Sequence, residues 1–169
     1  MQSDDMRQEL VHLGSGAHAL AIQILGNAED AADAVHDSFA TALGRPGAYD
    51  ARKGPLGPWF LRIVRNRCID LLRRRRPPSG VHVDELADRA DGPEAAAEQA
   101  DRDRLLKRAL ASIAADHREI LVLRDYLDLP YAQIAGVLDI APGTVMSRLH
   151  RARLALAEAY RKFDDHAKD

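Results

Sequence analysis

With 169 residues, of which 46% are hydrophobic and 30% charged, the chain can bury the core of one medium domain or two small ones, and wholesale disorder is not expected. Aromatic residues make up only 5% while alanine and leucine abound, so a β-sandwich or barrel is not expected either. The net charge of -2 hides a segregation of charge: residues 62–76 hold seven arginines and one aspartate, residues 148–162 hold five basic residues and one glutamate, and acidic residues dominate 1–50 and 84–103. Such alternating blocks favour two binding sites for a polyanion and acidic surfaces with other tasks.

Three helices are predicted in the N-terminal part of the chain. The first covers Ala17–Leu25, and the preceding Gly14-Ser15-Gly16 is expected to break or fray any longer helix. The second covers Ala28–Leu43 and has an apolar stripe opposite an acidic face. After a loop rich in glycine and proline, Pro58 suits the start of a third helix, Trp59–Arg75, in which apolar and basic residues interleave.

The interval Pro77–Gly92 marks a domain boundary. It opens on two prolines, a serine and a glycine, continues acidic and contains few apolar residues, which is typical of a flexible linker. We therefore expect an all-α protein of two small helical domains, residues 1–76 and 94–169, joined by an acidic, flexible linker at 77–93. Because this linker is too polar to hold the domains together, we expect them to move independently in the free protein.

Four helices are predicted in the C-terminal part. Apolar residues recur at helical spacing in Glu94–Ala114 and in Asp116–Leu127. A third helix starts at Pro130 and ends at a turn, Asp139-Ile140-Ala141, after which the fourth helix covers Gly143–Lys162.

The last two of these helices form a helix-turn-helix pattern, in which a short helix and a tight turn precede a basic helix. Val145, Leu149 and Ala152 are expected to face inward, which leaves short hydroxyl and long basic side chains on the outer face. Such side chains suit the base edges and phosphates of DNA. An ordinary helical hairpin with a solvated basic face is the alternative on periodicity alone.

Three stretches together resemble the extracytoplasmic-function (ECF) sigma factors. HREILVLRDYLDLPYAQIAGVLDIAPGTVMSRLHRARLAL resembles region four of that family, NAEDAADAVHDSFATAL resembles the acidic helix of region two, and GPLGPWFLRIVRNRCIDLLRRRRP resembles the basic helix of region two. The resemblance covers roughly Ala17–Ala157 apart from the linker, and three motifs in the right order are more specific than a lone helix-turn-helix. It implies a factor that binds core RNA polymerase, through the β′ clamp helices and the β flap, and directs it to promoter DNA.

The resemblance also implies roles for individual residues. The acidic helix of the family docks on the clamp helices, and the matching residues, which alternatively form a solvated face, are Glu29, Asp30, Asp33, His36 and Asp37. The family binds a flipped base and the melted strand of the minus-ten element through a loop and the basic helix, here Tyr49, Asp50, Arg52, Lys53, Arg62, Arg65, Asn66, Arg67, Arg73 and Arg74. The recognition helix would contact the minus-thirty-five element through base edges (Met146, Ser147 and His150) and phosphates (Thr144, Arg148, Arg151 and Arg153).

Three residues of the basic helix are given structural interpretations. Trp59 is expected to be a core residue rather than a stacking platform, Asp70 a helix partner of an arginine, and Cys68 a buried structural thiol rather than a redox sensor. Two departures from the family leave promoter preference open: Met146 stands where Lys or Arg is common, and the N-terminal helix is expected to be short and broken by glycines.

No catalytic motif competes with this interpretation, because HExxH, a Walker loop, GxGxxG and GxSxG are absent from the sequence. We expect neither enzymatic activity nor a cofactor or metal. The N-terminal stretch lacks the features of a signal peptide and no apolar run approaches the length of a membrane span, so we expect a cytoplasmic protein with no direct membrane insertion. The resemblance implies an anti-sigma factor as a further partner. Two alternatives remain: a DNA-binding regulator that has lost polymerase docking, and an adaptor whose basic faces bind an acidic protein.

Overall fold

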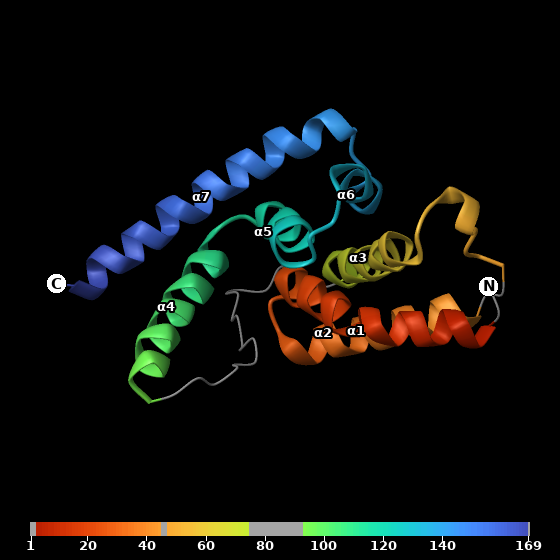
Figure 1. Ribbon diagram of the computed structural model, residues 1–169, viewed down its shortest axis with the longest axis horizontal. Helices are drawn as coiled ribbons and strands as arrows, with labels where there is room; N and C mark the ends of the chain where they lie inside the picture. The colour runs from red at the N-terminus through yellow and green to blue at the C-terminus, as the bar shows by residue number, and fades with distance from the viewer. Residues whose placement is uncertain (1–2, 45–46, 75–92, 169) are drawn as a thin grey trace.

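The computed structural model describes residues 3–44, 47–74 and 93–168, and all the regular structure within them is helical (Figure 1). The first unit contains α1 (Ser3–Leu25), α2 (Ala28–Gly44), the single 3₁₀ turn η1 (Ala51–Lys53) and α3 (Leu56–Arg74). The second unit contains α4 (Pro93–Ser112), α5 (Ala115–Leu121), the π-helical turn η2 (Val122–Tyr126), α6 (Tyr131–Leu138) and α7 (Pro142–Lys168). The predicted all-α class is confirmed. The predicted linker, except for its last residue, lies outside the described residues.

Helix α1 is continuous through Gly14-Ser15-Gly16, so the predicted break is wrong. Gly16 lies against the second unit: a Cβ atom at this position would come within 2.7 Å of Leu127 Cδ2. The missing side chain thus permits a close approach of the two units, while Leu10 and Leu20 of the same helix are fully buried. The burial of Leu10 and of most residues from Ala17 to Ile24 outweighs the helix propensity lost at each glycine, about 1 kcal/mol.

Two further boundaries differ from the prediction. Helix α3 begins at Leu56, two residues before Pro58, and proline is tolerated there because N–H groups in the first turn have no helical acceptor. The helix predicted over Asp116–Leu127 passes from α5 into the π-helical turn η2, in which the Leu127 N–H donates to Val122 O at 2.9 Å.

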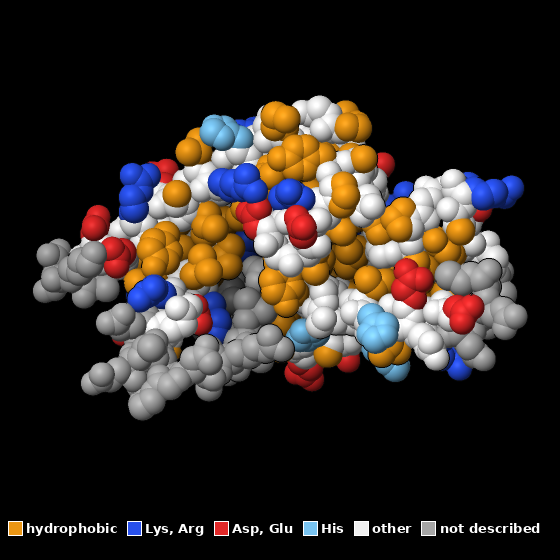
Figure 2. All heavy atoms as spheres, viewed as in Figure 1, with side chains coloured by type: hydrophobic (Ala, Val, Ile, Leu, Met, Phe, Trp, Pro, Cys, Tyr) orange, Lys and Arg blue, Asp and Glu red, His pale blue; other side chains and the backbone are white. Residues whose placement is uncertain are grey.

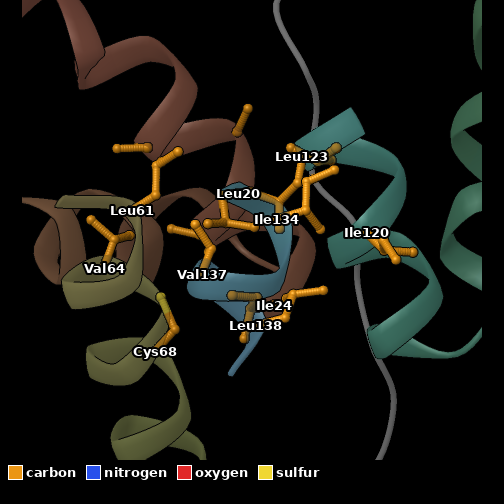
Figure 3. Close-up of a cluster of buried hydrophobic side chains, with 14 of the residues drawn as sticks. Leu20, Ile24, Leu61, Val64, Cys68, Ile120, Leu123, Ile134, Val137 and Leu138 are labelled. Atoms are coloured by element: carbon orange, nitrogen blue, oxygen red, sulfur yellow. The ribbon is translucent and has the colours of Figure 1, made fainter. Parts of the chain in front are cut away.

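The two units share one hydrophobic core, which corrects the expectation of independent movement. Helix α1 contacts α5 and η2 across the boundary between the units, and α3 contacts α6. Figure 3 shows apolar side chains of all these elements converging on one cluster, among them Leu20, Ile24, Leu61, Val64, Ile120, Leu123, Ile134, Val137 and Leu138. The expectation rested on the linker alone, whereas the contact is made by apolar faces of α1 and α3 that the first unit does not cover by itself.

Candidate nucleic-acid interface

Helix α6, the turn at 139–141 and helix α7 form the predicted helix-turn-helix. Asp139 ends α6 in the left-handed conformation, with φ 55°, and the Ile140 N–H donates to Ala135 O at 3.1 Å. Val145, Leu149 and Ala152 are buried, as their spacing predicts. The opposite face of α7 therefore points to solvent.

The predicted base-contacting residues lie on that open face. Met146 is 64% exposed, and Ser147 and His150 are exposed beside it. Arg151 is exposed as well, with Nε donating to Ser147 O at 3.3 Å, whereas Thr144 and Arg148 are half-buried.

Arg153 is engaged elsewhere. Its guanidinium pairs with Asp125 of η2, with Nε donating to Oδ2 at 3.2 Å. The pair ties α7 to η2 and neutralises the charge with which Arg153 was predicted to bind phosphate.

The cations of α3 fall into two groups, and the first group is open to solvent. Arg62 and Asn66 are exposed one turn apart, and Arg73 and Arg74 are exposed at the end of the helix. Asp70 Oδ1 lies 3.9 Å from Arg73 Nη1, as expected for a helix partner of an arginine. These side chains form a cationic face that fits a phosphate backbone.

The second group is bound to carboxylates of other helices. Arg67 Nε donates to Asp37 Oδ2 of α2 at 3.1 Å, so a predicted DNA contact and a predicted polymerase contact neutralise each other. Arg65 Nε donates to Glu119 Oε2 of α5 at 3.0 Å, across the boundary between the units. In this arrangement, neither arginine presents an uncompensated charge to DNA.

A cavity of about 320 Å³ lies where the loop before α3 faces α6. Tyr49 is fixed there by donating its hydroxyl to Gly54 O at 3.0 Å, and Gly54 has φ 139°, which favours glycine. The rings of Tyr49 and Trp59 are 5.3 Å apart between centroids, so Trp59, predicted to be a core residue, also forms a wall of the cavity. The side chains that line it suit a base and its phosphates, and include Tyr49, Lys53, Trp59, Arg62 and Gln133.

Asp50 and Arg52 shape this loop. Asp50 Oδ1 accepts the Arg52 N–H at 3.1 Å and Arg52 Nε at 2.9 Å, while Oδ2 accepts Nη2 at 3.0 Å. The Arg52 side chain holds the pKa of Asp50 below its ordinary value. The two predicted DNA contacts thus neutralise each other here.

The acidic face of α2 is only partly open. Glu29, Asp33 and His36 are exposed. Asp30 is half-buried, and its N–H donates to Oδ1 of the capping Asn27 at 2.8 Å.

Sequence reasoning missed two buried charges of α5, Arg118 and Glu119. Arg118 Nε donates to Gln23 O of α1 at 3.0 Å and its Nη1 to Ile113 O at 2.5 Å, and burial lowers the pKa of the guanidinium. The sequence signal for their burial was that the two charges directly precede the apolar run Ile120–Leu123, which is buried as a whole.

An apolar groove of about 390 Å³ lies between α4 and α7, where Figure 2 shows hydrophobic side chains gathered. Its apolar lining includes Leu106, Leu121, Leu156 and Tyr160, with Asp125, Arg153 and Arg161 around it. Within the described residues, no helix is both long and apolar enough to cross a membrane, and no cluster of His, Cys, Asp and Glu side chains is arranged to hold a metal.

Residues 11–77 match the sigma-70 region 2 family, and residues 103–156 match the sigma-70 region 4 family. The ECF RNA polymerase sigma factor SigL of Mycobacterium tuberculosis is 35% identical over 140 residues, which cover 80% of this chain and 77% of that protein. The ECF sigma factor SigW of Bacillus subtilis is 26% identical over 155 residues, which cover 85% and 82% of the two chains. The fold resembles that of the sigma factor RpoE of Bartonella quintana, solved with the anti-sigma factor NepR, with a TM-score of 0.75, 24% identity, and coverage of 93% and 97%. The chain belongs to the ECF RNA polymerase sigma factors, transcription initiation factors that direct core polymerase to promoters.

Proposed function

We propose that α7 reads the minus-thirty-five element and that α3, with the cavity before it, holds the melted minus-ten strand. The observation that carries this proposal is the sorting of side chains on α7: the apolar ones are buried, while Met146, Ser147, His150 and Arg151 stand exposed on one face. A helix so placed after a tight turn suits the major groove. Arg62 and Asn66 beside the aromatic cavity supply the cation, the amide and the ring faces that single-stranded DNA requires.

Polymerase has two proposed docking surfaces on this chain. The exposed Glu29, Asp33 and His36 of α2 would face the β′ clamp helices. The groove between α4 and α7 would hold a helix of the β flap, because it offers apolar lining flanked by charges of both signs.

An anti-sigma factor is a further proposed partner, supported by the complex in which the similar RpoE fold was solved. The site of action is the cytoplasm, where polymerase and DNA are. The chain itself supplies binding and no catalysis; polymerase performs the chemistry.

Run-off transcription tests the function. Core polymerase is incubated with genomic fragments, with or without the chain, and transcripts are mapped to their start points. Transcripts that depend on the chain and share upstream elements are expected. A chain that binds these fragments without polymerase but yields no transcript would instead be a DNA-binding regulator.

A further inference from the structure

Met146 is an exposed apolar side chain at the start of α7. It is 64% exposed, whereas the other large hydrophobic side chains of residues 142–150, Val145 and Leu149, are buried. Met146 therefore contributes little to the core of its own unit. An isolated exposed methionine needs no explanation by itself, so its surroundings decide what it can bind.

The surface beside Met146 is open on the side towards the start of the helix. Helical side chains lean towards the N-terminus of their helix, so Met146 extends towards the turn that contains Gly143. Apart from its chain neighbours, no side chain lies within 4 Å of the place that a Cβ atom of Gly143 would take. In a helix-turn-helix, residues of this first part of the second helix contact base edges in the major groove. A base can thus approach α7 closely here and meet the thioether side chain.

The polar side chains that adjoin Met146 in the sequence offer few free donors to such a base. Ser147 donates its one hydroxyl proton to Thr144 O at 3.1 Å, and Arg151 Nε in turn donates to Ser147 O. Arg148 is half-buried. A base acceptor that packs against Met146 would receive no hydrogen bond from the thioether or from the Ser147 hydroxyl, and would lose its water.

The four bases differ in how well they suit such a place. In the major groove, thymine presents an apolar group, the C5-methyl, whereas adenine and guanine present the acceptor N7 and cytosine presents the donor N4. A thioether is a weak acceptor and no donor, so its contact with these polar groups would remove water without replacing the hydrogen bonds. Met146 therefore favours thymine by contact and disfavours the other bases by desolvation.

We propose that Met146 selects a thymine in the minus-thirty-five element by packing its side chain on the C5-methyl group of that base. The inference rests on the proposed function, because it requires α7 to lie in the major groove. It also separates Met146 from its neighbours. Ser147 and His150 hydrogen-bond base edges, whereas Met146 reads a methyl group alone, and its flexible, unbranched side chain can adjust to the position of that methyl group.

The test uses the complete chain bound to core polymerase, with promoter duplexes as the probe. Duplexes randomised upstream of a mapped start point are first selected for tight binding, which yields the preferred upstream element. Each thymine of this element is then replaced singly by uracil, which differs from thymine only in lacking the methyl group. One of these replacements is expected to weaken binding about fourfold, as for the loss of one buried methyl-sized group.

The variants show whether Met146 is the residue that senses the methyl group. Met146→Ala is expected to bind the thymine and uracil duplexes equally, whereas the matched control Leu154→Ala, at a 57% exposed position two turns later on the same helix, should keep the fourfold difference. Both variants should keep the salt dependence of the wild type, because neither changes a charge. Met146→Gln should shift the preference at this position from thymine to adenine, because an amide pairs with N6 and N7 of adenine.

Two outcomes separate a failure of this inference from a failure of the proposed function. A uracil effect that persists in Met146→Ala, or a selected element in which no thymine methyl affects binding by the wild type, would overturn the methyl contact and leave α7 as the reading helix. Selection of no upstream element at all would overturn the proposed role of α7 and the methyl contact with it. Urea unfolding of Met146→Ala should match that of the wild type, because the side chain is exposed, so a loss of binding would not reflect a loss of folding.

Discussion

Removing the buried guanidinium of Arg118 is expected to lower the free energy of unfolding by about 3 kcal/mol. The side chain donates to Gln23 O at 3.0 Å and to Ile113 O at 2.5 Å, and so links the end of α1 to the connection between α4 and α5. A hydrogen bond from a charged group contributes about 1.5–3 kcal/mol, and Arg118→Ala loses two such bonds while relieving part of the cost of burying the charge. With a urea dependence of about 2 kcal/mol per molar, the midpoint of unfolding falls by about 1.5 M.

Arg161→Ala is the matched control for this measurement. Arg161 also donates to a backbone carbonyl, with Nε 3.3 Å from Ala157 O, but on the exposed surface of α7. Its replacement is expected to change the free energy of unfolding by less than about 0.5 kcal/mol. Arg118→Lys cannot reach both carbonyls with one ammonium, so its change in the free energy of unfolding should lie between those of Arg118→Ala and Arg161→Ala. If Arg118→Ala costs no more than Arg161→Ala, the two carbonyls are satisfied without the guanidinium and the reasoning fails.

The remaining predictions concern polymerase, pH and DNA. Asp33→Lys is expected to weaken binding to core polymerase without affecting urea unfolding, and unchanged affinity at low salt would contradict the docking surface. Asp37→Lys should weaken binding as well. It should also lower the free energy of unfolding by about 0.5–1 kcal/mol, because it breaks the pair with Arg67. Burial raises the pKa of Cys68 from 9.0 to about 12, so between these pH values the unfolded chain loses a proton that the native chain keeps. The free energy of unfolding therefore falls with rising pH, by about 1.4 kcal/mol at pH 10. Urea unfolding of Cys68→Ala should lack this component. Arg151→Ala is expected to weaken binding to specific and scrambled duplexes alike and to reduce the salt slope by about one, whereas His150→Ala should cost about 1–3 kcal/mol on the preferred sequence alone; the reverse pattern in duplex titrations would exchange their roles.

The buried face of α7 was predictable because the spacing of its apolar residues fits one face of a helix. Val145, Leu149 and Ala152 lie on one face of any helix, and a basic helix after a tight turn needs that face for its own unit. The continuity of α1 was not predictable in the same way. Gly16 lowers the local helix propensity, whereas the burial that keeps the helix continuous and the close packing of Leu127 on Gly16 depend partly on the other unit.

The predicted DNA contacts of α3 could likewise be foreseen only in part. In the sequence, Arg62, Arg65 and Arg67 are equivalent cations of one basic helix, yet the structure leaves only Arg62 exposed. What separates them is the position of carboxylates that lie 54 residues from Arg65 and 30 residues from Arg67 along the chain. Such distant partners follow only from the packing of whole helices, which one sequence without its fold does not supply.

The arrangement of the two units depends on the same kind of information. A polar linker makes independent movement possible, but whether units separate is decided by the free energy of the surface between them. Here that surface combines apolar side chains of α1, α3 and α6 with a buried ion pair, Arg65 with Glu119. A buried pair offsets its own desolvation only in part, so it contributes less to the strength of the contact than to its geometry. Either charge left alone would be costly to bury, so the pair favours the one packing of the two units in which Arg65 and Glu119 meet over any displaced packing.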